Sequence, residues 1–168
     1  MLVFVLALFD VDGSALLEDV PTAESNEVLS LSRDESVVVR IVDGDTIELE
    51  SGEIVRYIGI DTPETVHPQK DVQCYGQEAK MRNTELVMGR HIYMSKDVSE
   101  TDRYGRLLRY VYVEDEKGNE VFVNDTLVRE GYAVARTFPP DVAYQQQFAR
   151  DEQAARESKL GLWSTCYE

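Results

Sequence analysis

Three short runs of β-branched and apolar residues, separated by tight-turn dipeptides, constrain the fold more than any other feature of this chain. The runs cover residues 37–42, 46–50 and 54–60, with Asp43-Gly44 and Ser51-Gly52 between them. β-Branched residues favour strands, and Asp-Gly is a preferred pair in two-residue hairpin turns. The sequence therefore predicts a three-stranded antiparallel meander. Pro63 ends it, because proline lacks the amide donor that a central strand needs.

The rest of the chain mixes helices with two further strands. Helix-forming residues predict a helix over 76–88 that stops at Gly89, and strands follow over 91–94 and 107–113. Asn124 and Asp141 are candidate N-caps of two later helices, over 124–131 and from 141 to about 161. Five short strands with interspersed helices predict a small α+β barrel. No apolar run approaches the roughly 20 residues that a membrane span needs.

Charge is distributed unevenly along the 168 residues. The chain has 17 basic and 32 acidic residues, a formal charge of −15, which by itself argues against binding to nucleic acid. Residues 1–15 begin with the apolar run MLVFVLALF and are interpreted as a truncated signal segment, with a stray apolar tail or strand as the alternative. Residues 16–36 are predicted to be an acidic, disordered linker, and residues 37–166 the folded domain. A signal segment implies a secreted or cell-surface protein.

Only two cysteines occur, Cys74 and Cys166. An even pair behind a candidate signal segment is compatible with a disulfide, and two unrelated free thiols are the alternative. Neither cysteine lies in a Cys-x-x-Cys or Cys/His cluster, which argues against a zinc site.

Three acidic residues fall where a meander brings strand ends together. Asp45 opens the second run, and Asp61 and Glu64 follow the third. Hard cations such as Ca²⁺ bind carboxylate and carbonyl oxygens, so Asp45, Asp61 and a backbone carbonyl near Thr62 are candidate ligands. The alternative is that these acids only serve turns, where Asp is common for local reasons.

Two arginines accompany the acids. Arg56 lies inside an apolar strand, where a charged side chain needs a partner, and Arg106 follows a Tyr-Gly turn. Guanidinium groups bind phosphate bidentately and stabilise charge that develops on phosphorus. Carboxylates, a divalent ion and two arginines are the parts of a phosphodiesterase. The alternative is an ordinary ion pair for Arg56 and a solvated turn for Arg106.

These residues resemble the staphylococcal nuclease (thermonuclease) family in type, order and spacing. The resemblance runs from about Val37 to Trp163 and is highly specific when its segments are taken together. It is carried by Asp43-Gly44-Asp45-Thr46, Arg56, Asp61-Thr62-Pro63-Glu64-Thr65, Asp102-Arg103-Tyr104-Gly105-Arg106, His67-Pro68, Tyr75-Gly76-Gln77-Glu78-Ala79, 124–131 and Leu160-Gly161-Leu162-Trp163.

The resemblance implies a five-stranded OB-fold β-barrel with three helices and one bound Ca²⁺. It also implies hydrolysis of DNA and RNA, with single-stranded or denatured substrates favoured, at the bond between phosphorus and the 5′ oxygen to leave 3′-phosphate ends. By the same match, Asp45 and Asp61 are ligands through their side chains and Thr62 through its carbonyl. Glu64 is the general base, and Arg56 and Arg106 hold the scissile phosphate.

The resemblance also assigns binding residues and shows a departure. Lys70 and Arg103 match positions that contact a neighbouring phosphate, and Tyr104 matches one near the nucleotide. Thr137-Phe138-Pro139-Pro140 stands where the family carries stacking aromatics, so only Phe138 keeps such a surface. The expected protein is a monomeric, Ca²⁺-dependent nuclease. The competing interpretation is an inactive OB-fold module that binds single strands.

Overall fold

A computed structural model describes residues 33–65 and 72–167. The candidate signal segment, most of the expected linker and Lys70 therefore lie outside the described residues. The first strand begins at Asp34, earlier than the expected domain boundary at Val37. Within the described ranges no helix is long and apolar enough to cross a membrane.

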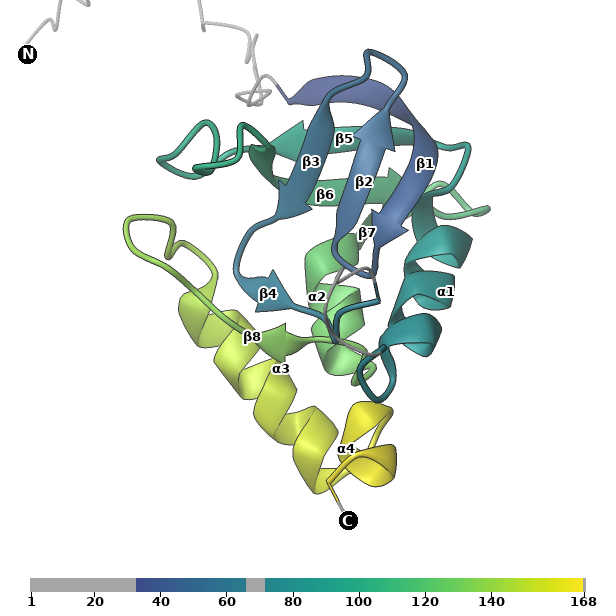
Figure 1. Ribbon diagram of the computed structural model, residues 1–168, viewed down its shortest axis with the longest axis vertical. Helices are drawn as coiled ribbons and strands as arrows, with labels where there is room; N and C mark the ends of the chain where they lie inside the picture. Colours follow the sequence, from purple (N-terminus) through teal and green to yellow (C-terminus); the bar gives the residue numbers. More distant parts are fainter. Residues whose placement is uncertain (1–32, 66–71, 168) are drawn as a thin grey trace, which may run out of the picture. The chain divides into compact units, whose positions relative to one another are not determined.

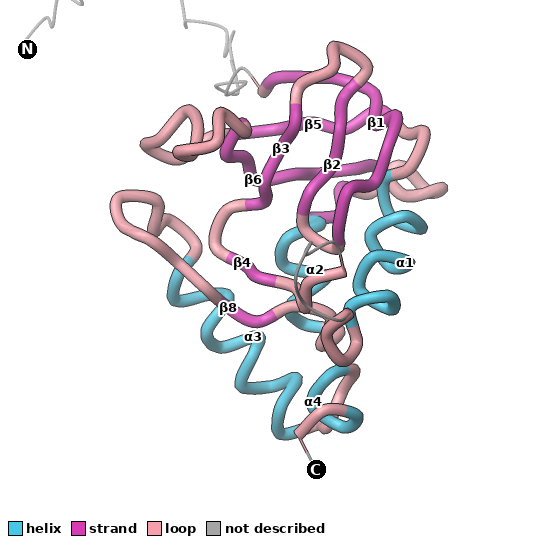
Figure 2. Tube along the Cα trace, in the orientation of Figure 1, coloured by secondary structure: helices cyan, strands magenta, loops and turns pink. Residues whose placement is uncertain are grey.

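A closed five-stranded barrel forms the body of the domain (Figures 1 and 2). The expected meander is present, and its strands pair antiparallel with β1 in the middle of the barrel order β3-β2-β1-β5-β6. Val55 to Tyr57 pair in parallel with Leu107 to Arg109, which closes the barrel. The predicted α+β OB-fold barrel is thus confirmed. Its strands are β1 (Asp34–Asp43), β2 (Thr46–Leu49), β3 (Ile54–Tyr57), β5 (His91–Ser95) and β6 (Leu107–Glu114).

The alternation of side chains along the strands fills the barrel. Apolar side chains such as Ile47, Val55 and Ile92 are fully buried, and this burial is the main favourable term in folding. The helix α1 (Gly76–Val87) lies beside β1 where the sequence predicts it, with Val87 buried in the same core (Figure 1).

The second helix, α2 (Val123–Arg129), starts directly after the short edge strand β7 (Glu120–Phe122). Asn124 was expected as its N-cap, and this is wrong, because Phe122 occupies that position. The Asn124 side chain is fully buried and connects the residue after β3 to the middle of β6. Its amide donates to the Ile58 carbonyl at 2.9 Å, and its oxygen accepts from the Val111 amide at 2.9 Å.

The third apolar run divides into two elements instead of one strand. β3 stops at Tyr57, and Gly59 turns the chain with a φ of 79°, a conformation that favours glycine. A two-residue strand, β4 (Ile60–Asp61), then pairs antiparallel with β8 (Val134–Ala135). This pairing connects the loop after the meander to the C-terminal third of the chain.

The last helical region also differs from expectation. The helix α3 (Gln145–Glu157) begins after Tyr144, so Asp141 is not its N-cap; the Asp141 carboxylate instead accepts hydrogen bonds from the amides of Val98 and Ser99. A separate short helix, α4 (Leu162–Thr165), follows. Cys166 comes next and forms a disulfide with Cys74, with 6.0 Å between the Cα atoms.

Candidate active site

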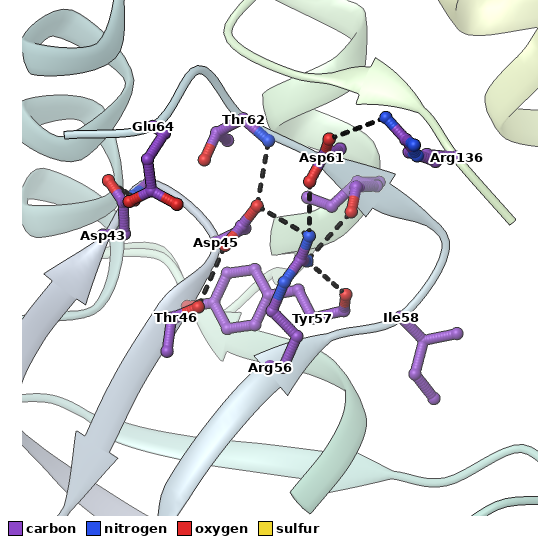
Figure 3. A network of polar contacts seen from close by, with 12 residues as sticks. Asp43, Asp45, Thr46, Arg56, Tyr57, Ile58, Asp61, Thr62, Glu64 and Arg136 are labelled. Carbon is purple, nitrogen blue, oxygen red and sulfur yellow. Dashed lines mark hydrogen bonds and ion pairs between the residues drawn. The ribbon is translucent and has the colours of Figure 1, made fainter. Parts of the chain in front are cut away.

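The turn between β1 and β2 places Asp45 against the loop that follows β4 (Figure 3). Asp45 is buried, and its Oδ2 accepts a hydrogen bond from the Thr62 amide at 2.9 Å. Gly44 makes this approach possible: a Cβ atom on it would lie 2.7 Å from the Thr62 hydroxyl oxygen. The Asp-Gly turn therefore fixes a carboxylate as well as reversing the chain.

Arg56 lies between the two predicted ligand carboxylates (Figure 3). Its Nη2 atom is 3.0 Å from Asp45 Oδ2 and 2.7 Å from Asp61 Oδ1. Its Nη1 group donates to the carbonyls of Tyr57 and Ile60. The ion pair that a strand arginine needs is thus present, and it is made with the same acids that the sequence predicts as metal ligands.

Two acids of this site, Asp61 and Asp43, have raised pKa values, chiefly because they are buried. Burial raises the pKa of Asp61, Arg56 opposes this increase, and the charge of Asp45 adds to it. Burial also raises the pKa of Asp43, and so does a hydrogen bond shared with Glu64. The arginine beside Asp61 therefore offsets only part of the cost of burying these carboxylates.

Asp43 holds the loop that carries Glu64. Its Oδ1 accepts from the Thr65 hydroxyl at 2.7 Å and from the Gly44 amide at 2.9 Å. Figure 3 shows the Glu64 side chain beside Asp43, on the opposite side of Asp45 from Arg56. Sequence reasoning had given Asp43 only a turn role, and its contact with the Glu64 loop is visible only in three dimensions.

Arg106 is oriented by its own turn. Its Nε donates to Asp102 Oδ2 at 2.7 Å, and Asp102 Oδ1 accepts from the amides of Tyr104 and Arg106. Burial raises the pKa of Asp102, but the hydrogen bonds from Arg106 and Tyr104 outweigh burial and leave that pKa below its usual value. Asp102 therefore stays ionised and keeps the Arg106 guanidinium in one orientation.

Two adjacent cavities share Arg56 and Arg106. The first, of about 490 Å³, contains all the predicted ligand and catalytic residues, and the second, of about 500 Å³, contains the described binding candidates. The aromatic side chains of the second cavity, Tyr104 and Phe138, are 67% and 64% exposed, so both are accessible to a ligand. Lys70 aside, the structure brings together the site residues that the sequence predicts: Asp45, Arg56, Asp61, Thr62, Glu64 and Arg106 in the first cavity, and Arg103, Tyr104 and Phe138 in the second.

Arg136 is a site residue that sequence reasoning missed. It follows β8, whose pairing with β4 brings it beside Asp61, and its NH1 lies 3.3 Å from Asp61 Oδ2 (Figure 3). Its side chain is 59% exposed, and its guanidinium also lies 5.7 Å from the Phe138 ring centre. Two-residue strands leave no pattern in a sequence, so only the pairing itself reveals this neighbour.

The donor set fits a hard cation. Across residues 33–65 and 72–167, no group of three or more His, Cys, Asp and Glu side chains is arranged to hold a metal ion. The predicted set has only two carboxylates and one carbonyl, all oxygen donors of the kind that Ca²⁺ prefers. One cation already contacts these donors, because Arg56 Nη2 lies within 3.0 Å of an oxygen of both the Asp45 and the Asp61 carboxylates.

Fold and site together define a class: an OB-fold barrel with clustered carboxylates and arginines in one cleft beside the meander. Residues 54–165 match the family described as "Staphylococcal nuclease homologue", and the chain belongs to this family.

Similar proteins include two from Bacillus subtilis (strain 168). The chain is 45% identical over 130 residues to "SPbeta prophage-derived endonuclease YokF" and 43% identical over 130 residues to "Endonuclease YncB". Each match covers 74% of this chain but only 42% and 59% of these relatives, respectively. The chain is also 38% identical to "Thermonuclease" of Staphylococcus hyicus over 76% of this chain and 74% of that protein.

Proposed function

We propose that this protein is a Ca²⁺-dependent nuclease that hydrolyses DNA and RNA at the bond between phosphorus and the 5′ oxygen. The observation that carries the proposal is the single cavity lined by Arg56 and Arg106 together with Asp45, Asp61 and Glu64. Carboxylates for a metal and a base, next to two phosphate-binding guanidiniums, are the groups that phosphodiester hydrolysis needs. The names of the similar proteins, endonuclease and thermonuclease, support the nuclease activity in this proposal.

The proposed cation site consists of the Asp45 and Asp61 carboxylates and the Thr62 carbonyl. When bound there, Ca²⁺ supplies positive charge that offsets the charge developing on the phosphate oxygens. The two carboxylates both face the Nη2 atom of Arg56, so they already point toward one part of the cavity.

The side chains of the chain itself perform the remaining steps. Glu64 accepts a proton from the attacking water and aligns it for in-line attack. Arg56 and Arg106 hold the non-bridging oxygens of the scissile phosphate. Arg106 also stabilises the leaving 5′ oxygen, so cleavage leaves a 3′-phosphate end.

Substrate binding is assigned to the second cavity. Tyr104 and Phe138 offer exposed ring faces on which a base stacks, and stacking needs a base that is free of its partner strand. We therefore propose that single-stranded or denatured nucleic acid is preferred. Arg103, whose guanidinium lies 4.6 Å from the Tyr104 ring centre, contacts a phosphate next to the scissile one, as does Lys70.

We propose that the protein acts outside the cytoplasm, as a secreted or cell-surface monomer. Disulfides persist in oxidising compartments, and the bond between Cys74 and Cys166 supports such a location. Fractionation of the producing cells tests this location. It would be overturned if the disulfide-bonded protein, whose cysteines do not react with an alkylating agent, were recovered only from the cytoplasm.

The experiment that tests the proposed function uses a 5′-labelled single-stranded oligonucleotide with Ca²⁺ or with a chelator. We expect fragments only with Ca²⁺, and a phosphatase that removes 3′-phosphates should shift their mobility. Anisotropy of the same oligonucleotide measures binding. Binding without cleavage in Ca²⁺ would instead identify an inactive OB-fold binding module.

A further inference from the structure

One residue outside both cavities contacts both backbone polar groups of Glu64. The backbone amide of Glu64 donates to the side-chain oxygen of Gln73 at 3.0 Å, and the backbone amide of Gln73 donates to the Glu64 carbonyl at 3.0 Å. The carboxylate of a general base must stay aligned with its water, and its backbone position sets where that carboxylate lies. Gln73 therefore fixes the origin of the Glu64 side chain.

The start of α1 extends this contact. The Gly76 amide donates to the Gln73 carbonyl at 3.0 Å. A Cβ atom on Gly76 would lie 3.0 Å from the Pro63 carbonyl oxygen and 3.2 Å from that of Glu64, so a larger residue there would require the loop to move by a few tenths of an ångström. The segment from Gln73 to Gly76 is thus packed against the Glu64 loop from one side.

A disulfide also anchors this segment to the C-terminal region. Cys74 follows Gln73 and is bonded to Cys166, directly after α4. That short helix is fixed to the domain: the Leu162 amide donates to the Gly131 carbonyl at 2.9 Å, and Trp163 is buried. The disulfide therefore connects this fixed helix to the residue next to Gln73, although Gln73 itself is exposed.

We propose that Gln73 is a positioning residue for Glu64 and that the Cys74–Cys166 disulfide holds Gln73 in place. This inference rests on the proposed function, in which Glu64 is the base. Loss of the Gln73 hydrogen bond or of the disulfide lets the Glu64 backbone shift. Small misplacements of a reacting group cost large factors in rate. Neither Gln73 nor the disulfide lines the second cavity, where the substrate is proposed to bind. Loss of either should therefore lower kcat and change KM little.

Kinetics on single-stranded DNA with saturating Ca²⁺ provide the first test. Gln73→Met keeps the side chain's length and removes its acceptor oxygen, whereas Gln73→Glu retains an acceptor. We expect Gln73→Met to lower kcat about tenfold or more with KM within about twofold, and Gln73→Glu to recover most of kcat. Gln77→Ala, an exposed change in the first turn of α1, is the matched control and should leave kcat unchanged.

A double-mutant cycle links the disulfide to Gln73. Cys74→Ser/Cys166→Ser should lower kcat, and adding Gln73→Met to it should cost much less than it costs in the parent, because both changes release the same contact. Multiplicative losses would show that the disulfide does not act through Gln73. An unchanged kcat in Gln73→Met, or an equal fall in Gln77→Ala, would overturn the positioning role.

Amide hydrogen exchange keeps the inference testable apart from nuclease activity. The Glu64 amide should exchange faster in Gln73→Met and in the double cysteine variant, while amides of the barrel strands keep their protection and show that the fold is intact. Unchanged exchange at Glu64 would contradict the inference even if the wild type cleaves DNA. Altered exchange in a protein that does not cleave DNA would contradict only the proposed function.

Discussion

Arg136 and Arg129 are two arginines with nearly equal side-chain exposure, 59% and 60%, and different surroundings. Arg136 lines the second cavity and pairs with Asp61, whereas Arg129 pairs with Asp125 on α2 and lines neither cavity of the site. A phosphate bound near Arg136 would be attracted by a guanidinium that the sequence does not reveal. The two residues therefore form a matched pair for testing a contact with nucleic acid.

We expect Arg136→Ala to raise KM for single-stranded DNA and to reduce the slope of log KM against log salt concentration by about 0.7, the contribution of one phosphate contact on a single strand. Arg129→Ala should leave both quantities unchanged. Initial rates at several KCl concentrations measure the slopes. Equal slopes for the Arg136→Ala variant and the wild type would show that Arg136 does not contact the substrate backbone.

Asn124 tests a buried contact that the sequence misassigned. Replacing it with alanine leaves the Ile58 carbonyl and the Val111 amide without their partner inside the core. We expect a loss of roughly 3 kcal/mol in the free energy of unfolding, because buried unpaired polar groups are costly. Denaturant titration measures it, and Asn119→Ala, in an exposed turn, should cost less than about 1 kcal/mol. Similar losses in both variants would contradict this account.

Among the elements, those with a repeating pattern were predictable and the shortest were not. Alternating side chains and turn dipeptides identified β1, β2, β5 and β6, and helix-forming residues identified α1. The pairing of β4 with β8 depends on residues more than seventy positions apart, so no local pattern contains it. The N-cap predictions at Asn124 and Asp141 failed for a related reason, because both side chains bond to distant backbone groups.

The same distinction holds for the site. Asp45, Arg56, Asp61 and Glu64 were predictable because the meander brings its own ends together. Arg136 and Gln73 were not, since their positions depend on the β4–β8 pairing and on the packing of α1 against the loop.

The interface between α2 and α3 contains a pair of acids that makes stability depend on pH. Burial, a hydrogen bond with Asp125 on α2 and the charge of Asp125 together raise the pKa of Asp151 to about 6, against the weaker effects of Arg129 and Arg150. The folded protein therefore binds a proton that the unfolded chain releases at lower pH, so stability falls as pH rises from about 4 to 6.

We expect Asp151→Asn to remove this part of the pH dependence. The variant should unfold at a higher denaturant concentration than the wild type at pH 7, and the difference should disappear below about pH 4, where Asp151 is protonated in both states. Denaturant titrations of both proteins at several pH values measure it. A constant difference across that range would contradict the role of Asp151.

For the whole molecule, the disulfide closes a loop between residues 92 positions apart. In the chain-entropy account, closing so long a loop in the unfolded state stabilises the fold by about 4.6 kcal/mol. We expect a reducing agent to lower the denaturation midpoint of the wild type. The midpoint of Cys74→Ser/Cys166→Ser should already be low and should not change on reduction. Equal midpoints for the oxidised wild type and this variant would contradict a stabilising role.

The net charge of −15 is a poor guide to the partner of this molecule. Four arginines, Arg56, Arg103, Arg106 and Arg136, gather at one cavity beside the acidic cluster. Attraction of phosphate depends on such local charges, and the bound Ca²⁺ that we propose adds two more positive charges there. A chain that composition alone would exclude from nucleic-acid binding can therefore carry a nuclease site.

The release of acid-soluble nucleotides from denatured DNA tests this central claim most directly. With Ca²⁺ the wild type should release them, and a chelator should stop the release. Glu64→Gln and Arg106→Ala should each lower the rate by roughly 10²-fold or more while their melting temperatures stay close to that of the wild type. Release that persists in the chelator, or that survives in both variants, would contradict the assignment of the reaction to this cavity.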